Sequence, residues 1–247
     1  GKKKILDYID ERADLITEVS DKIWEYAELS LREYKSGDLY AKVFEEEGFV
    51  VEHPFDNIET ALKASYGSGK PVIGILAEYD ALTGLSQVAG LSERKELVPD
   101  GNGHGCGHNL LGAGSMAAAF ALKKYLEEKG EGSGTVIFYG CPGEEGAATK
   151  AFMARDGVFA ECDACLTWHP GNVNQVTSGT CNTCIQTEYK FTGVASHAAG
   201  APEKGRSALD AVELMNVAVQ FLREHMPDSA RIHYSITDAG GASPNVV

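Results

Sequence analysis

The spacing of hydrophobic and polar positions changes several times along the chain. Helical spacing of apolar residues predicts helices at residues 3–27, 34–48, 110–129 and 147–155. Short, continuous apolar runs, typical of strands buried on both faces of a parallel sheet, occur at residues 71–77, 135–139 and 164–168. Because these strands alternate with helices, we expect an α/β fold with a mainly parallel sheet between helices, in three αβα layers.

The pattern changes from about residue 182. Residues 184–191 and 231–237 alternate as strands with one polar face, and a helix is expected between them at 208–225. This order predicts the β-α-β start of a second, α+β domain, in which residues from 244 onward begin a further strand. We therefore expect residues 1–181 to form the N-terminal part of one domain and residues 182–247 the first half of another.

Composition narrows the function. The 247 residues, 43% of them hydrophobic, are enough to bury a substantial core. A net charge of −14 argues against nucleic-acid binding, which needs clustered Lys and Arg. The first residues carry no apolar signal segment, and no apolar run is long enough for a membrane span. We expect a cytoplasmic protein whose six cysteines are thiols or metal ligands rather than disulfides.

Side chains that suit metal ions follow or precede the predicted sheet elements. Cys106 and His108 lie in a glycine-rich loop that leads into the helix at 110–129, and the glycines let both side chains reach one point. Glu144 and Glu145 follow the second apolar strand, and His169 ends the third. Ligands gather at the carboxyl ends of strands in open α/β sheets, so we expect these loops to converge.

Adjacent glutamates make chemical sense if one binds metal and the other moves protons. A carboxylate beside an activated water can take its proton as general base and return it to a leaving nitrogen. Two divalent ions about 3.5–4 Å apart lower the pKa of that water and polarise an amide carbonyl. The reaction class predicted from these residues is metal-assisted amide hydrolysis.

Six motifs occur in the order seen in the aminoacylase and carboxypeptidase metallohydrolases: residues 77–82 (AEYDAL), 105–109 (GCGHN), 143–145 (GEE), 168–170 (WHP), 196–199 (SHAA) and 205–211 (GRSALDA). In detail the chain resembles the branch that contains aminobenzoyl-glutamate hydrolase and related N-acyl-amino-acid amidohydrolases. The resemblance implies a catalytic α/β domain interrupted by a ferredoxin-like lid domain, which also forms a homodimer.

The resemblance also implies roles for individual residues. The metal ligands it implies are Cys106, His108, Glu145 and His169. Glu144 matches the general base, and His197 matches a lid residue that reaches the partner subunit's active site and stabilises the oxyanion. Asn245 resembles a lid asparagine that holds the substrate carboxylate, and Asp80 an acidic residue that supports a ligand from behind.

The implied cofactors are two zinc or manganese ions, because a Cys106 thiolate suits zinc whereas carboxylates leave manganese open. The implied substrate is a small N-acyl or N-aroyl amino acid, or a dipeptide, with a free carboxylate. The chain departs from the family pattern at Asn109, where much of the family has Asp. A further histidine ligand is expected after residue 247, so residues beyond it are needed for full activity.

Two other hypotheses stay open at this point. Cys162, Cys165, Cys181 and Cys184 have the spacing of a four-thiolate zinc ribbon, which would make the chain a protein-interaction module. Alternatively, the chain is a catalytically inactive fragment kept for dimerisation. The Gly112-x-Gly114 pair only superficially matches a dinucleotide fingerprint, because it lies within a predicted helix and no strand directly precedes it.

Overall fold

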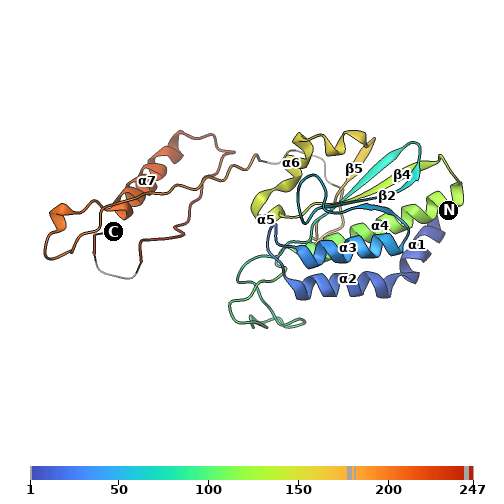
Figure 1. Ribbon diagram of the computed structural model, residues 1–247, viewed down its shortest axis with the longest axis horizontal. Helices are drawn as coiled ribbons and strands as arrows, with labels where there is room; N and C mark the ends of the chain where they lie inside the picture. The colour runs from blue at the N-terminus through green and yellow to red at the C-terminus, as the bar shows by residue number, and fades with distance from the viewer. Residues whose placement is uncertain (1, 177–179, 181, 242–244, 247) are drawn as a thin grey trace. The chain divides into compact units, whose positions relative to one another are not determined.

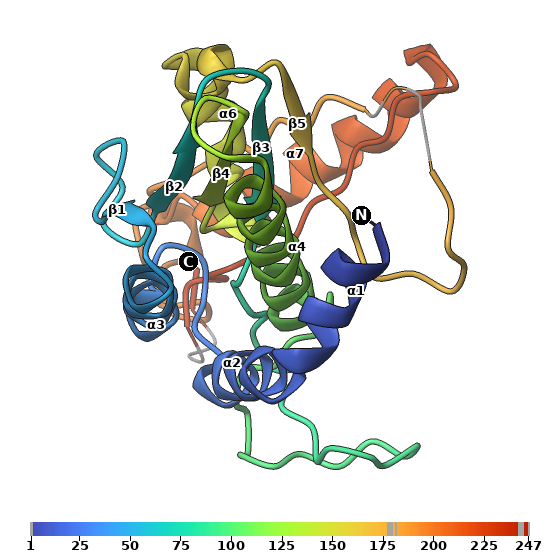
Figure 2. The ribbon, with the colours of Figure 1, turned by 90° about the vertical axis from the view of Figure 1, so that its right-hand side faces the viewer.

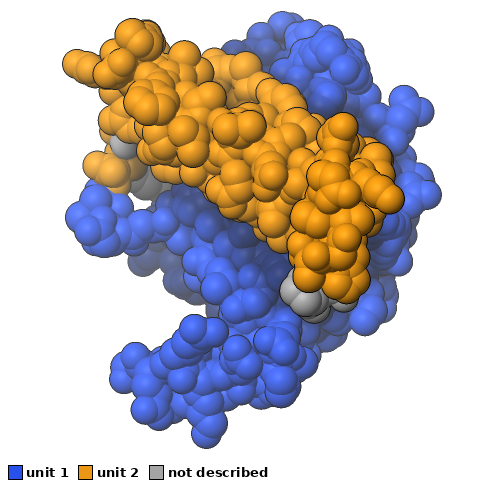
Figure 3. Space-filling view, turned by 90° about the vertical axis from the view of Figure 1, so that its left-hand side faces the viewer, with its two compact units in different colours: residues 1–174 blue, residues 175–247 orange. Residues whose placement is uncertain are grey.

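The computed structural model describes residues 2–176, 180, 182–241 and 245–246. The chain forms two compact units, residues 1–174 and residues 175–247 (Figure 3). The sequence predicts a domain boundary between residues 181 and 182. Cys181 itself lies outside the described residues.

Four α-helices lie on one face of the unit 1 sheet: α1 (Lys2–Glu11), α2 (Ala13–Tyr26), α3 (Tyr34–Glu46) and, after the first three strands, α4 (His108–Lys129). The single helix expected at residues 3–27 is two helices, because Arg12 leaves helical geometry and pairs with Glu47 at the end of α3. α4 packs on β3 and β4 and is contacted by α1 and α2 (Figure 2).

The sheet has five strands in the order β1-β2-β4-β3-β5. They are β1 (Val50–Glu52), β2 (Leu62–Ser68), β3 (Val72–Ala77), β4 (Gly134–Gly140) and β5 (Ala164–Leu166). β3 runs parallel to β4 and β5, whereas β2 runs antiparallel to both β1 and β4. The expected mainly parallel sheet is therefore a mixed one. Polar residues interrupt the sequence of β2, so its pattern was not recognised as a strand.

The alternation of side chains along β4 builds a core on each face of the sheet. Val136 and Phe138 belong to the larger core, under α2, α3 and α4. Ile137 and Tyr139 belong to a smaller core with Met153 of α6 (Thr149–Arg155) and with residues of the short helix η1 (Val158–Glu161). The three αβα layers are therefore present (Figure 1).

β5 is shorter and more exposed than its sequence predicts. The strand expected at residues 164–168 covers only 164–166, and all three residues are exposed. β5 is the last strand on its side of the described sheet, so it pairs only with β3 and does not reach the interior. The expectation that it is buried on both faces was wrong for the part of the chain that the structure describes.

Unit 2 contains α7 (Ala208–Leu222) between the short helices η2 (Pro202–Lys204) and η3 (Arg223–His225). Over residues 182–241, the strands expected at 184–191 and 231–237 are not formed. Their side chains are mostly exposed, because neither segment has a partner strand or a core to cover its apolar face. Across the described parts of both units, none of the helices has the length and apolar character needed to span a membrane.

Candidate metal centre

The turns after β3, β4 and β5 and the N-terminus of α4 lie at one edge of the unit 1 sheet. β3, β4 and β5 are parallel, so their carboxyl ends lie on the same side. The turn after β3 carries Glu78 and Asp80, and the turn after β4 leads into the short helix α5 (Glu144–Ala147). α4 begins at His108, and His169 follows β5. The convergence expected from the sequence is observed.

His108 is at the centre of this edge and is fully buried. Its Nδ1 lies 2.9 Å from Oδ1 of Asp80, and its Nε2 lies 3.0 Å from Oε2 of Glu78. The same Nε2 is 3.8 Å from Oε2 of Glu144 and 3.9 Å from Oε1 of Glu145. Asp80 therefore contacts the Nδ1 side of the imidazole, whereas three glutamate carboxylates surround Nε2.

Two overlapping groups of side chains have the spacing of metal ligands. One ligand atom from each of Cys106, His108 and His169 lies within 4.8 Å of the others. Glu78, His108 and Glu144 meet the same criterion. His169 is exposed, and its ring stands almost perpendicular to that of His108 with 5.7 Å between ring centres. The structure thus brings together Cys106, His108 and His169, three of the four ligands expected from the sequence.

Glu78 was missed by the sequence analysis. It lies two residues before Asp80, directly after β3, so an alternating backbone places both carboxylates on one side. Its buried side chain forms an ion pair with Lys150 of α6. Burial alone raises the pKa of Glu78, but His108 and Lys150 outweigh it and lower the pKa to about 2. Glu78 is therefore a charged carboxylate facing the imidazole.

Three buried polar atoms at this edge, Oε2 of Glu78, Nε2 of His108 and Oε1 of Glu145, form no hydrogen bond of good geometry among the described residues, although the first two lie 3.0 Å apart as an ion pair. All three are good donors of electron pairs to a divalent cation, and they converge on the same space. The residues present therefore fit a metal centre, with nitrogen, oxygen and thiolate ligands available together.

Glu144 and Glu145 are almost equally far from His108, and only Glu144 belongs to a group with metal-ligand spacing. Burial favours the opposite assignment, because the Glu145 side chain is 19% exposed and that of Glu144 is 41% exposed. Desolvation, and to a lesser extent the neighbouring Glu78, raise the pKa of Glu144. The backbone N–H of Glu145 is also fixed, at 2.8 Å, by Oδ2 of Asp80. The more buried and more tightly held glutamate suits a ligand, and the more exposed one suits proton transfer.

The surrounding carboxylates raise the pKa values of two ligand candidates, His108 and Cys106. Burial lowers the pKa of His108, but Asp80 and Glu78 outweigh it and raise the pKa to about 10. The carboxylate of Glu145, followed by burial, raises the pKa of the Cys106 thiol to about 11. Both groups need a cation at this point to lose their protons at neutral pH, because a bound metal ion reverses the local electrostatics.

Two neighbouring contacts hold the ligand loops. The ring Nε1 of Trp168 donates to the carbonyl of Leu111 at 3.2 Å, and a Cβ added at Gly114 would come within 2.7 Å of that ring. Gly114 therefore lets α4 pack closely against the ring of Trp168. Asn109 donates from Nδ2 to Oγ of Ser20 at 3.1 Å. Its amide therefore serves contact with α2.

In unit 2, an antiparallel bridge pairs Ser196 with Val246. This register sets His197 opposite Asn245, the two residues that the sequence resemblance assigned to a lid. Nδ1 of His197 accepts hydrogen bonds from the backbone N–H groups of Ala199 at 3.2 Å and Gly200 at 2.9 Å. The ring proton is therefore on Nε2, which makes that nitrogen a donor. Both side chains are exposed.

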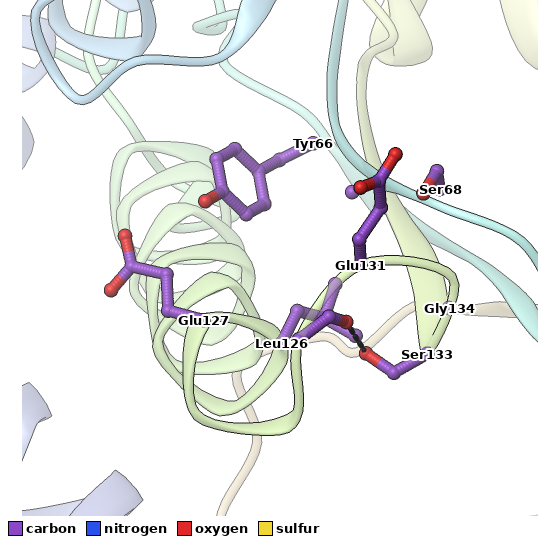
Figure 4. Close-up of a pocket in the computed structure, with 9 residues that line it drawn as sticks. Tyr66, Ser68, Leu126, Glu127, Glu131, Ser133 and Gly134 are labelled. Atoms are coloured by element: carbon purple, nitrogen blue, oxygen red, sulfur yellow. Dashed lines mark hydrogen bonds between the residues drawn. The ribbon is translucent and has the colours of Figure 1, made fainter.

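A hollow of about 390 Å³ lies at the other end of the sheet (Figure 4). It is formed where β2 ends, β4 begins and α4 finishes, and Ser133 closes part of it by donating to the carbonyl of Gly130 at 2.7 Å. None of its lining residues belongs to the metal centre. The candidate metal centre lies at the opposite edge of the sheet.

The cysteine quartet is divided between the units: Cys162 and Cys165 lie in unit 1, Cys184 lies in unit 2, and Cys181 is outside the described part. The five described cysteines are all thiols, as expected. The zinc-ribbon hypothesis is not favoured, because the cysteine in the group with metal-ligand spacing among the described residues is Cys106.

The comparison with known families agrees with the geometry of the site. The pattern of peptidase family M20/M25/M40 matches residues 74–245, which include every candidate ligand. The chain belongs to peptidase family M20/M25/M40. The match begins within β3 and continues into unit 2, so both units carry sequence features of the M20 family.

Individual M20 relatives include one of the subunits of p-aminobenzoyl-glutamate hydrolase from Escherichia coli (strain K12), which is 51% identical over 98% of this chain and 50% of its own length. The Xaa-Arg dipeptidase of Mus musculus is 30% identical over 100% of this chain and 55% of its own length. The chain thus spans about half the length of these curated relatives.

Among solved structures, a dinuclear metal-binding peptidase of the M20 family from Bacillus subtilis is 27% identical, with a TM-score of 0.52 over 62% of this chain and 41% of that one. An aminobenzoyl-glutamate utilization protein from Klebsiella pneumoniae has a TM-score of 0.58 at 19% identity, over 98% of this chain and 66% of that one. The second likeness shows the fold alone.

Proposed function

We propose that this chain is part of a metal-dependent amidohydrolase that cleaves the amide bond of N-acyl or N-aroyl amino acids, or of dipeptides, with a free carboxylate. The observation that carries the proposal is the convergence of Cys106, His108 and His169, with carboxylates beside them, at the carboxyl ends of three parallel strands. The 51% identity to part of a p-aminobenzoyl-glutamate hydrolase supports an aroyl-glutamate-like substrate.

The residues divide into those that hold metal and those that move protons. The proposed ligands are Cys106, His108, Glu145 and His169, with Glu78 as a further carboxylate. Two zinc or manganese ions there would lower the pKa of a water molecule and polarise the amide carbonyl. Glu144, more exposed than Glu145, takes the proton from the attacking water and gives it to the leaving nitrogen. Its raised pKa suits both steps.

We assign substrate binding and oxyanion stabilisation to unit 2. The proton on Nε2 of His197 makes it a hydrogen-bond donor for the oxyanion, and the amide of Asn245 can bind the substrate carboxylate. On this proposal residues 182–247 are the first half of a lid that forms a homodimer, and His197 acts in the partner's active site. Supporting the assignment are the bridge that pairs Ser196 with Val246 and the resemblance of these motifs.

The decisive experiment measures metal content together with hydrolysis of p-aminobenzoyl-glutamate and of several N-acyl amino acids. It compares the wild-type protein with Glu144→Ala and His169→Ala. We expect His169→Ala to weaken metal binding and Glu144→Ala to keep metal but lose turnover. Equal metal content in all three proteins, with no turnover in any, would overturn the proposal.

A further inference from the structure

Glu33 is a carboxylate buried completely within unit 1, outside the metal centre. It ends the loop between α2 and α3. Its Oε1 accepts a hydrogen bond from the backbone N–H of Gly143 at 2.7 Å, and its Oε2 accepts one from Oγ1 of Thr60 at 3.1 Å. Because a buried carboxylate is costly without such partners, its presence here points to a specific task.

The partner of Glu33 is the residue directly before the proposed general base. Gly143 is 110 positions away in the sequence and has a φ of +68°, a conformation that L side chains rarely adopt. A Cβ at Gly143 would also lie 3.1 Å from Oγ of Ser30 and 3.2 Å from the side chain of Leu31. The turn that leads to Glu144 therefore rests directly on the loop that carries Glu33.

The same loop holds both acid-bearing turns of the site. Oγ of Ser30 accepts a hydrogen bond from the backbone N–H of Gly146 at 3.1 Å, on the far side of the glutamate pair. The carbonyl of Glu28 accepts one from the N–H of Ala81 at 2.8 Å, next to Asp80. Residues 28–33 thus fix the turn after β3 and the turn after β4 relative to each other.

We propose that Glu33 is a positioning residue for the general base. Its hydrogen bond to the N–H of Gly143 sets the direction in which the backbone enters residue 144, and so the place of the Glu144 carboxylate. The inference rests on the proposed function of Glu144. A displacement of about 1 Å in a reacting group lowers the rate roughly 100-fold. Holding the turn before Glu144 in place therefore offsets the cost of burying the Glu33 carboxylate.

The experiment compares Glu33→Ala and Glu33→Gln with Glu47→Ala in the zinc-loaded protein. Gln keeps an acceptor for Gly143 and a partner for Thr60, whereas Ala keeps neither. Glu47 is a matched control, because it lies at the other end of α3 with a side chain only 8% exposed and contacts α1 and α4 instead of the site. The readouts are kcat, KM, bound zinc and amide hydrogen exchange at Gly143.

For Glu33→Ala we expect kcat to fall by roughly 10- to 100-fold with KM and bound zinc unchanged, and exchange at Gly143 to become faster. Glu33→Gln should restore kcat to within a few-fold of wild type, and Glu47→Ala should leave kcat unchanged. If Glu33→Ala does not fold, Ser30→Ala tests the same support and should lower kcat in the same way, with faster exchange at Gly146.

Two results would overturn the positioning role: a kcat for Glu33→Ala no lower than that for Glu47→Ala, or a loss of bound zinc in proportion to the loss of kcat. Failure of the proposed function looks different, because the wild-type protein itself would then show no turnover. In that case exchange at Gly143 still decides whether Glu33 anchors the turn, and unchanged exchange in Glu33→Ala rejects it.

Discussion

The carboxylate of Asp80 bridges His108 and Glu145. Its Oδ1 accepts a hydrogen bond from Nδ1 of His108 at 2.9 Å, and its Oδ2 accepts one from the backbone N–H of Glu145 at 2.8 Å. When a metal ion displaces the proton from Nε2, the first bond keeps the remaining imidazole proton on Nδ1, so that the lone pair of Nε2 is directed at the metal. One side chain therefore aligns two proposed ligands from different elements.

Replacing Asp80 should weaken metal binding without removing a ligand. In Asp80→Asn one side of the amide becomes a donor, which cannot accept from both neighbours. We expect zinc affinity to fall by about 10- to 100-fold, as measured by calorimetric titration. Asp38→Asn is the matched control, because Asp38 contacts His53 at 3.0 Å away from the metal centre. Equal affinities in the two variants would contradict the role of Asp80.

Glu78→Gln tests the carboxylate that only the structure revealed. The change keeps the shape of the side chain but removes the negative charge that faces Nε2 of His108, so we expect a lower zinc affinity or the loss of one bound ion per chain. Elemental analysis after dialysis measures the stoichiometry. Glu161→Gln breaks a comparable ion pair, with Lys63 at 2.7 Å, and should change nothing. An unaltered stoichiometry and affinity in Glu78→Gln would remove Glu78 from the ligand set.

Substitutions of the two adjacent glutamates should have different effects on metal binding and on kcat. Glu144→Gln should keep bound metal and lower kcat by about 10²- to 10⁴-fold, because the amide cannot accept the proton from water. Glu145→Gln should lose metal first and activity as a consequence. Metal content and kcat measured on the same samples distinguish the two, and the opposite result would exchange the roles assigned from burial.

Cysteine variants distinguish the metal centre from a zinc ribbon. Cys106→Ser should weaken zinc binding, because it removes a thiolate within 4.8 Å of the His108 and His169 ligand atoms. Cys165→Ser should leave zinc binding unchanged, since Cys165 belongs to neither ligand group. Zinc affinity measured by competition with a chelator is the test. A selective effect of Cys165→Ser would revive the ribbon hypothesis.

Glu33 should make the stability of the protein depend on pH. Burial raises its pKa from 4.5 to about 7, although the bonds from Gly143 and Thr60 act in the opposite direction. Between these values the folded state holds a proton that the unfolded state has lost, so the contribution of Glu33 to the free energy of unfolding is greatest below pH 4.5 and is lost as the pH rises to about 7.

The comparison that isolates this effect is wild type against Glu33→Gln, which cannot titrate. Urea unfolding at several pH values from 4.5 to 8 gives the free energy of unfolding of each protein. We expect the wild type to lose stability relative to Glu33→Gln across that window. Parallel curves for the two proteins would mean that Glu33 does not titrate there.

Much of the fold of unit 1 could be predicted from local pattern. Continuous apolar runs located β3 and β4 to within a residue or two, because a strand buried on both faces needs apolar residues at every position. The sequence pattern does not predict β2, because its residues face environments of mixed polarity. Without β2, the antiparallel pairing that makes the sheet mixed could not be predicted either. The strands expected at 184–191 and 231–237 are not formed in the described part of unit 2, since an alternating segment becomes a strand only where a partner strand pairs with it.

For the site, the sequence by itself determined which residues stand at the ends of the strands: Cys106, His108, the glutamate pair and His169 follow from motif order and from the topology of α/β sheets. Tertiary structure alone decided that Glu78 faces His108 and that Glu33 reaches Gly143. These contacts join segments tens of residues apart, 110 in the case of Glu33 and Gly143. Local sequence determines where helices, strands and turns form. Only tertiary packing determines which buried charged groups come into contact, because a charged group removed from water needs a partner that the rest of the fold supplies.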